Sequence, residues 1–324
     1  MTRSAYQQFV AKADEQADDG DFNSACSMVY RWWSLLEAPA GTDTSKFLEG
    51  LFDTSISVQM PDLGIDISGS AAIASMLAVG LRNGRPSYSV RDDAFEVSYL
   101  GDGVYRLQAA FSWHSQTAEG RSVGGQGKCD HLLRKIGPAR MIFTRIREQR
   151  GDALEQAGFE SSYRLHRIKS VLLQWQANMD TLNGDSSGLR ELVMPEMEFH
   201  GLISAKLDHS ERRDGVVTDF TEMKGMLAGT DGKEETVIRG FDGVTKWFAT
   251  GPSLLKRNIH RAERFEITPL EHDRYGVIAQ FGWYAQTLNG VEIELHQPLE
   301  WTIVERGEKY MRLEKLHPHA MPPG

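Results

Sequence analysis

A stretch in the first half of the chain recurs in the second half without a gap. Residues 95–120 read FEVSYLGDGVYRLQAAFSWHSQTAEG, and residues 265–290 read FEITPLEHDRYGVIAQFGWYAQTLNG. About ten of these positions are identical, including the pair Trp113 and Trp283. Self-similarity at a fixed offset is typical of a duplicated structural unit. The chain is therefore predicted to use one module twice.

The repeat also predicts where the domains begin and end. Trp33 pairs with Trp175 near the start of each copy, and the length of 324 residues suits two domains. We expect a helical extension at 1–21, a first domain at 22–150, a linker at 151–161, a second domain at 162–317 and a tail at 318–324. The second copy is longer because of an insertion at about 201–239. This segment is charged and rich in glycine, which is typical of an extended loop or a hairpin.

Composition narrows the classes of partner. The formal net charge of -9 gives no electrostatic basis for binding a nucleic-acid backbone. Cys26 and Cys129 show no CxxC spacing, and the histidines are scattered, so we expect no disulfide framework, no metal and no cofactor. The start of the chain lacks the apolar core of a secretory signal, and no apolar run approaches the roughly 20 residues that span a bilayer. We expect a cytoplasmic protein without a membrane partner.

The hydrophobic period changes in a fixed order within each copy. Residues 22–38 show helical spacing, and a short second helix is expected to run through Phe52. A strand follows, then a third helix at 71–79, and then three or four strands with period two up to Arg147. Helices followed by an antiparallel sheet predict an α+β fold, in which the sheet curves around the helices and leaves a pocket at its mouth.

Residues 50–73, GLFDTSISVQMPDLGIDISGSAAI, resemble a motif of the nuclear transport factor 2-like or SnoaL-like superfamily. The ketosteroid isomerase branch of that superfamily is the most similar, and the resemblance covers most of both copies. It implies two tandem cone-shaped domains, each with three helices packed in a curved antiparallel sheet. It also implies a pseudo-dimer in which the two sheets meet face to face. This scaffold hosts isomerases, dehydratases, cyclases and non-catalytic modules, so the fold alone does not assign a function.

The resemblance places the isomerase residues at definite positions of this chain. The general-base carboxylate corresponds to Met60 and, in the second copy, to a position near Gly201, and neither can take a proton. The tyrosine of the first helix corresponds to Trp33 and Trp175, whose N–H groups donate but do not titrate. The third catalytic group, an acid, corresponds to Asp130 and Glu300.

Two interpretations of these acids stay open at this stage. Asp130 and Glu300 are either cavity acids with raised pKa values, or strand residues that are solvated or paired with an arginine. A general base would then come from His114, His131 or His200. We favour a contact between domains for His114 and a surface position for His200.

Large side chains are expected to line the two cone cavities. The expected lining residues are Trp33, Met60, Trp113, Trp175, Trp283 and Trp301. For the repeated pair on the first helices, a packing role in the core is the favoured alternative.

Two functions of different class follow. The first is a protein that binds a small apolar or aromatic molecule, with metal-free acid–base chemistry of a dehydratase, isomerase or cyclase type. The second is a non-catalytic interaction or scaffold protein. Loss of the base position favours the second function, and the retained acids favour the first, which we prefer. The sequence leaves a higher oligomer open.

Overall fold

The structure is a computed structural model of the chain. It describes residues 11, 18–39, 41–80, 85–90, 94–116, 119–155, 158–181, 187–201, 216–217, 236–250, 255–288, 290, 292–306 and 308–318. The chain divides into two compact units. The N-terminal unit comprises Ser24–Leu173 and Gly307–Tyr310, and the C-terminal unit comprises Met1–Asn23, Gln174–Arg306 and Met311–Gly324.

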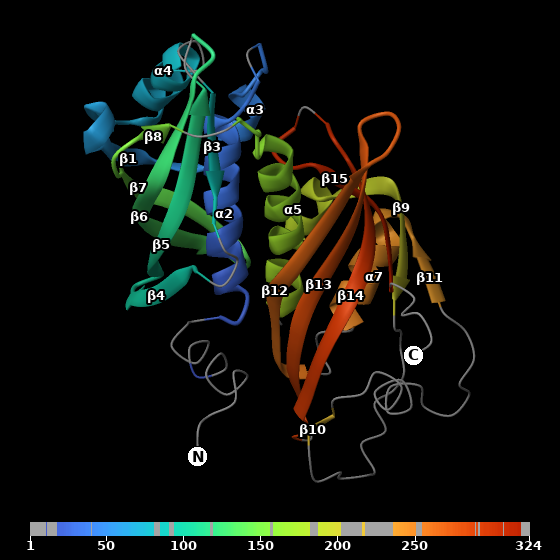
Figure 1. Cartoon of the computed structure of the whole chain (residues 1–324). Helices are drawn as coiled ribbons and strands as arrows, with labels where there is room; N and C mark the ends of the chain where they lie inside the picture. The colour runs from blue at the N-terminus through green and yellow to red at the C-terminus, as the bar shows by residue number, and fades with distance from the viewer. Residues whose placement is uncertain are drawn as a thin grey trace. The chain divides into compact units, whose positions relative to one another are not determined.

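The first copy of the module contains three α-helices and a curved sheet among its described residues (Figure 1). The helices are α2 (Asp21–Leu36), α3 (Ser45–Leu48) and α4 (Ser70–Gly80), and a 3-10 turn, η1, covers Pro61–Leu63. The strands are β1 (Phe52–Met60), β2 (Ile65–Ser68), β3 (Arg85–Ser89), β4 (Glu96–Gly101), β5 (Val104–Gln116), β6 (Ser122–Gly137), β7 (Arg140–Arg150) and β8 (Leu154–Glu155). The strand order is β2-β1-β7-β6-β5-β3, with β4 also paired to β5 and β8 to β6.

The second copy repeats this arrangement. It contains α5 (Tyr163–Asp180), the 3-10 turn η2 (Ser187–Glu191), β9 (Val193–Gly201), β10 (Val216–Val217), β11 (Thr236–Arg239), α7 (Gly240–Thr250), β12 (Leu255–Pro269), β13 (Arg274–Thr287), β14 (Glu292–Val304) and β15 (Arg312–Pro318). Its strand order, β11-β9-β15-β14-β13-β12, matches that of the first copy strand for strand, and β10 pairs with β14. The long strand β12 takes the place of the two separate strands β3 and β4.

The register of the central hairpin is the same in both copies. Gln108 on β5 lies opposite Asp130 on β6, and Ile278 on β13 lies opposite Glu300 on β14. At the offset of the gapless sequence repeat, Gln108 corresponds to Ile278 and Asp130 corresponds to Glu300. The prediction of an α+β fold with two copies of one module is therefore confirmed.

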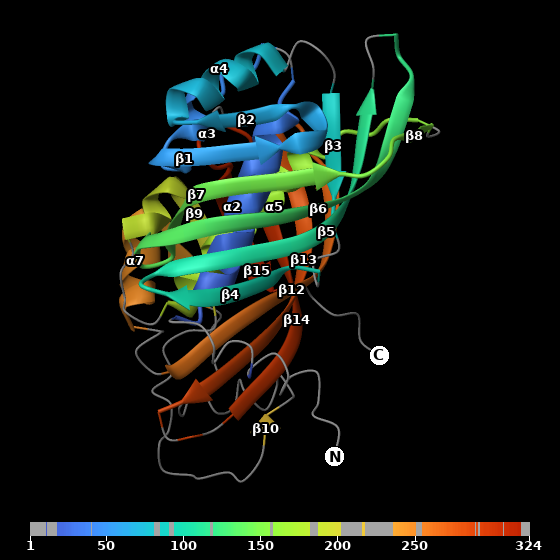
Figure 2. The same cartoon turned by 90° about the vertical axis from the view of Figure 1, so that its left-hand side faces the viewer.

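Helix α2 supplies the core of the first copy. Its spacing of apolar residues places Val29, Trp32 and Trp33 at zero exposure. Figure 2 shows strands β7, β6 and β5 passing in front of this helix, so the inward face of the sheet covers it. The predicted alternation on β5 is also confirmed, because every second residue from Tyr105 to Trp113 is buried.

Two local predictions differ from the structure. The second helix, α3, ends at Leu48 and does not reach Phe52, because Phe52 already begins β1. The strand region continues past Arg147 to Arg150, and this extension includes the buried Glu148.

The strands on either side of the expected insertion pair with each other. Met60 and Ile65 pair across the short connection between β1 and β2, and Gly201 and Thr236 pair at the matching place between β9 and β11. Most of the insertion, most of the predicted extension 1–21 and most of the tail 318–324 lie outside the described residues. The predicted domain boundaries and the pseudo-dimeric arrangement stay predictions.

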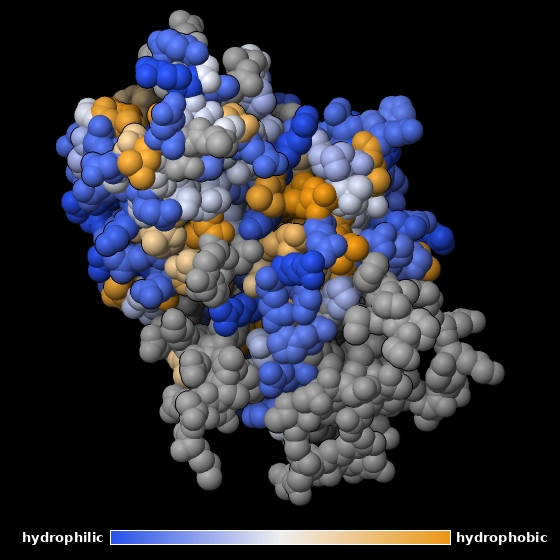
Figure 3. All heavy atoms as spheres, in the orientation of Figure 1, coloured by the Kyte–Doolittle hydropathy of each residue, from blue (hydrophilic) through white to orange (hydrophobic). Residues whose placement is uncertain are grey.

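No helix in the described ranges is both long and apolar enough to cross a bilayer. On the face drawn in Figure 3, hydrophobic residues form small separate groups among hydrophilic ones.

Candidate active site in the N-terminal unit

A glutamate lies inside the core of the N-terminal unit. On β7, Ile146 and Glu148 are buried, whereas Arg147 and Gln149 are exposed. Glu148 also lies opposite the buried Cys129 on β6. Residues directly opposite each other on neighbouring strands share a face of the sheet, so the pleat points this carboxyl group towards α2.

The two oxygens of Glu148 have different surroundings. Oε1 accepts a hydrogen bond from the indole N–H of Trp32 and another from that of Trp33, each at 2.9 Å. Oε2 is buried and has no hydrogen-bond partner among the described residues. A buried carboxylate oxygen without a partner is costly, and it marks a place where a ligand group can donate a hydrogen bond.

Burial raises the pKa of Glu148 from 4.5 to about 7. The hydrogen bond from Trp33, the positive charge of Arg150 and the hydrogen bond from Trp32 act in the opposite direction but only partly offset the burial. A carboxyl group with a pKa near neutrality can both release and accept a proton under ordinary conditions. This property is typical of a general acid or base.

His131 is a titratable neighbour of Glu148. Its Nε2 lies 3.7 Å from Oε1 of Glu148, and its Nδ1 accepts the backbone N–H of Arg147 at 3.3 Å. Burial lowers the pKa of His131 to about 3, so the ring is neutral at neutral pH. Its Nε2 is also buried without a hydrogen-bond partner in the described part of the chain. Two neighbouring buried side chains, Glu148 and His131, thus each have a polar atom without a partner among the described residues.

Arg150 acts on Glu148 through its positive charge and also contacts two aromatic rings. Its guanidinium lies over the rings of Tyr88 and Trp113, at 5.3 and 5.2 Å from the centroids, and it donates to the hydroxyl of Tyr88. Burial raises the pKa of that tyrosine, so its hydroxyl stays protonated. The indole N–H of Trp113 is buried with no acceptor among the described residues. This end of the core therefore offers a cation, a phenol and a free N–H donor.

Aromatic stacking holds these groups in place. The rings of Trp33 and Tyr88 are parallel within 3°, with centroids 5.5 Å apart. Phe111 meets both rings edge-on, at 5.6 and 5.5 Å. Trp33, one of the two tryptophans that donate to Glu148, is thus fixed by packing on two sides, which orients its N–H towards the carboxylate.

The second copy lacks this polar centre. Trp301 takes the register position of His131, and Pro318, opposite Leu299, takes that of Glu148. Trp175 packs edge-on against Trp301 with a centroid distance of 5.6 Å. Phe199 and Phe248 pack against the other sides of Trp175. The interior of the C-terminal unit is filled by aromatic rings where the first copy has a carboxyl group and an imidazole.

Asp130 does not fit the interpretation of a cavity acid. It accepts from Nε and Nη2 of Arg106 at 2.9 and 2.5 Å, and Arg145 lies 3.3 Å away. The hydrogen bond from Arg106 lowers the pKa of Asp130. Its cross-strand partner Gln108 belongs to the polar face of β5, so the pleat turns Asp130 away from the core. The alternative of pairing with an arginine is the one observed.

Glu300 and His200 lie on the corresponding outer face of the second copy. Glu300 keeps 46% of its side chain exposed, and its Oε1 is 3.9 Å from Nε2 of His317. The ring of His200 contacts the ring of the same His317, with centroids 5.5 Å apart. Neither residue lies with the buried aromatic cluster, and His200 is half-buried.

The other predicted site residues have varied surroundings. His114 is half-buried between Ser87 and Gly124, on the face opposite Trp113. Met60 is buried at the end of β1. Trp283 is half-buried and belongs to a separate polar network in the C-terminal unit.

Of the residues at this site, the sequence pointed only to His131, Trp33 and Trp113. Glu148 and Arg150 were not predicted. The sequence did contain a signal for Glu148, because in a strand with a period of two Glu148 lies on the same face as the apolar Ile146.

No group of three or more metal-ligating side chains occurs among the residues that the structure describes. Both Cys26 and Cys129 are buried free thiols.

No protein-family model and no curated protein matches the chain. Solved structures that resemble it include a nuclear transport factor 2-like protein from Salmonella enterica serovar Typhimurium (11% identity, 43% of this chain, 95% of that chain, TM-score 0.32). Another is a candidate dehydratase of the nuclear transport factor 2-like family from Streptomyces avermitilis (14%, 42%, 99%, 0.36). A third is a protein with a cystatin-like fold from Caulobacter vibrioides (12%, 49%, 90%, 0.33). Each match spans less than half of this chain.

Proposed function

We propose that the N-terminal unit binds a small, uncharged, hydrophobic or aromatic molecule and transfers a proton to or from it through Glu148. The observation that carries this proposal is the unpartnered Oε2 of a buried carboxyl group whose Oε1 is held by two tryptophans. A ligand that donates a hydrogen bond to Oε2 would satisfy the one oxygen that the protein leaves open.

The surroundings of Glu148 suit a proton-transfer step. The two indole donors stabilise the carboxylate after it loses its proton, and burial stabilises the protonated form, so the two states are close in free energy. Arg150 and the Tyr88 hydroxyl supply donors for an oxygen that becomes negative during the reaction. Neutral His131, whose Nδ1 accepts a backbone N–H, carries its proton on Nε2 and offers that nitrogen as a further donor. These groups fit metal-free dehydration, isomerisation or cyclisation.

The uncharged nature of the ligand follows from the same residues. The core is lined by aromatic rings, and Arg150, a cation that acts on Glu148, already faces two rings and a phenol. A charged ligand would lose its hydration without gaining a full counter-charge. A flat apolar body with a hydroxyl or carbonyl group meets the available contacts.

The scaffold alternative keeps support from the second copy. Proline at position 318 cannot titrate, and Trp301 with Trp175 fills the matching interior. We therefore assign the acid–base role to the N-terminal unit alone.

Ligand-observed NMR in D2O tests the proposal with a panel of small neutral aromatic carbonyl and hydroxyl compounds. It reports binding and the exchange of acidic C–H protons for deuterium in one experiment. We expect a compound that binds and exchanges, and an exchange rate about 100-fold lower in Glu148→Gln, as for the loss of a general base. Asp130→Asn is the matched control and should keep the wild-type rate. A panel without binders, or exchange that survives in Glu148→Gln, would favour the scaffold alternative.

A further inference from the structure

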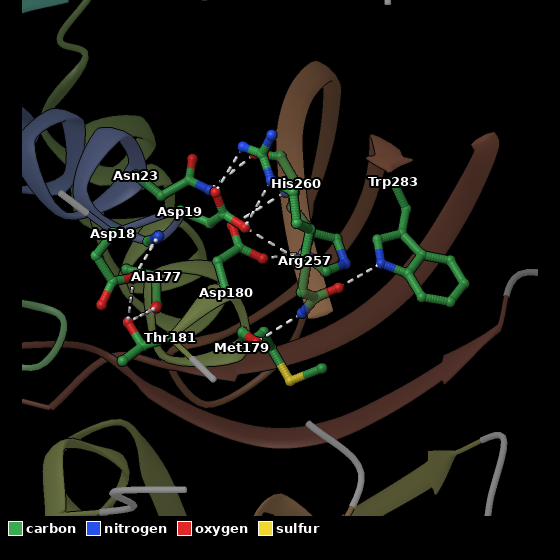
Figure 4. A network of polar contacts seen from close by, with 12 residues as sticks. Asp18, Asp19, Asn23, Ala177, Met179, Asp180, Thr181, Arg257, His260 and Trp283 are labelled. Atoms are coloured by element: carbon green, nitrogen blue, oxygen red, sulfur yellow. Dashed lines mark hydrogen bonds and ion pairs between the residues drawn. The ribbon is translucent and has the colours of Figure 1, made fainter. Parts of the chain in front are cut away.

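A second buried acid lies in the C-terminal unit, at the end of α5. Figure 4 shows Asp180 between Asn23 and His260, with Trp283 on the far side of the histidine. Asp180 is 1% exposed. The second copy thus has a polar centre of its own, away from the aromatic cluster around Trp301.

Three N–H groups converge on Asp180. Oδ1 is 2.5 Å from Nδ1 of His260, and Oδ2 accepts the backbone N–H of His260 at 3.0 Å and the amide of Asn23 at 2.9 Å. Burial raises the pKa of Asp180 to about 6, and the contacts with His260 act against that rise. At neutral pH the carboxylate is ionised, so Nδ1 of His260 must carry a proton in order to donate to it.

This arrangement leaves one ring nitrogen of His260 available. With Nδ1 facing Asp180, Nε2 is the remaining ring nitrogen, and it has no hydrogen-bond partner within the described residues. A histidine with its single proton on Nδ1 can accept a hydrogen bond at Nε2. The side chain of His260 keeps 12% exposure, in contrast to fully buried His131. A buried aspartate that fixes the tautomer of a reachable histidine is the arrangement found in proton-transfer sites.

Neighbouring contacts hold the imidazole ring still. Trp283 stacks on it with an angle of 11° and a centroid distance of 6.0 Å. The indole N–H of Trp283 donates to Asn258 at 2.6 Å, and Asn258 in turn donates to the carbonyl of Met179. A ring fixed on one face and at one nitrogen presents its other nitrogen in a single direction.

We infer that Asp180 and His260 form a second ligand site, in which Nε2 of His260 accepts a hydrogen bond from the hydroxyl of a small uncharged molecule. Asp180 orients the ring, and His260 contacts the ligand. The site is separate from Glu148 and does not depend on the function proposed for it.

Local charges argue for an uncharged ligand. Arg257, the cation beside the pair, is already bound to Asp19 at 2.8 Å. An added anion would meet the carboxyl groups of Asp180 and Asp19, which disfavours its binding. The acceptor at Nε2 needs a donor, and a phenol supplies an O–H together with a flat apolar body.

Diethyl pyrocarbonate tests the inference, because it acylates unprotonated imidazole nitrogens that solvent can reach. Nε2 attacks a carbonyl carbon of the reagent, ethyl carbonate leaves, and Nδ1 passes its proton to Asp180. Labelling of each histidine is followed by peptide mass spectrometry at neutral pH. We expect His260 to react at a rate close to that of exposed His272, and saturating phenol to slow the reaction at His260 about tenfold and leave His272 unchanged.

A variant and a spectrum address the role of Asp180. In Asp180→Asn the amide N–H would face Nδ1 and force the proton onto Nε2, so labelling of His260 should fall about tenfold. Two-dimensional nitrogen NMR of the wild-type protein should show the proton of His260 on Nδ1, a readout that does not depend on whether the variant folds. The inference is overturned if His260 is as unreactive as buried His131, if phenol gives no protection, or if the wild-type proton lies on Nε2.

Discussion

Glu148 on β7 and Pro318 on β15 occupy the same register position in the two copies of the module. The first lies opposite Cys129 and the second opposite Leu299. The β5–β6 and β13–β14 hairpins have the same pairing register residue for residue, so the difference at this position lies in the side chains. Duplication has kept the scaffold in both copies and an interior acid at this place in one.

The raised pKa of Glu148 predicts a pH-dependent stability. Its folded pKa of about 7 exceeds the unfolded value of 4.5, so the folded state binds more protons between these values. The stabilising contribution is complete below the unfolded pKa and is lost as pH rises through about 7, by on the order of 3 kcal/mol. Urea unfolding midpoints across this range should fall more steeply for the wild type than for Glu148→Gln.

Parallel pH profiles of the two proteins would contradict this prediction. The comparison must be a difference between variants, because burial also raises the pKa values of Asp180 and Glu37. Those groups contribute the same slope to both proteins.

Trp33→Phe and Trp301→Phe form a matched pair. Both tryptophans are fully buried, but the N–H of Trp33 donates to Glu148, whereas that of Trp301 has no partner among the described residues. We expect Trp33→Phe to lower the free energy of unfolding by about 1.5–3 kcal/mol more than Trp301→Phe. It should also raise the pKa of Glu148 further. Equal losses in chemical denaturation would show that the indole hydrogen bond contributes nothing.

The ion pair of Asp130 with Arg106 should matter little. Arg106 keeps 43% of its side chain exposed, and pairs of this kind contribute roughly 1 kcal/mol or less. Asp130→Asn should therefore leave the thermal midpoint and the pH profile almost unchanged. A loss as large as that of Trp33→Phe would mean that the outer face of the sheet is more important than its exposure indicates.

The insertion should be removable. Gly201 and Thr236 pair as Met60 and Ile65 do, so residues 202–235 can be replaced by the four-residue connection Pro-Asp-Leu-Gly of the first copy. Shortening a connection of this length favours folding by up to about 2 kcal/mol. Circular dichroism and thermal unfolding should show a folded protein of equal or higher stability. Loss of the folded state would mean that the insertion stabilises the C-terminal unit.

The repeat made the fold predictable, since two copies of one pattern must solve the same packing problem twice. The alternation of β5 also indicated which residues of the neighbouring strand β6 face the core. Leu107 is buried and lies opposite His131, and polar Gln108 lies opposite Asp130. Pairing of these strands in register would have placed His131 inside and Asp130 outside.

Glu148 was harder to find, because its strand continues beyond the part that the period-two pattern was expected to cover. The family resemblance pointed to Asp130, one position away from the inward-facing His131. The pair Asp180 and His260 could not be predicted at all. Its members come from a helix end and a distant strand, and only the fold brings them together.

The protonation state of Glu148 is the most direct test of the account. Carbon-13 NMR of the glutamate side-chain carboxyl carbons, recorded against pH, isolates one resonance by its absence in Glu148→Gln. We predict that this resonance titrates near pH 7 and that a bound neutral hydroxyl compound shifts it. Titration at the ordinary value of 4.5, with no response to any such compound, would contradict it.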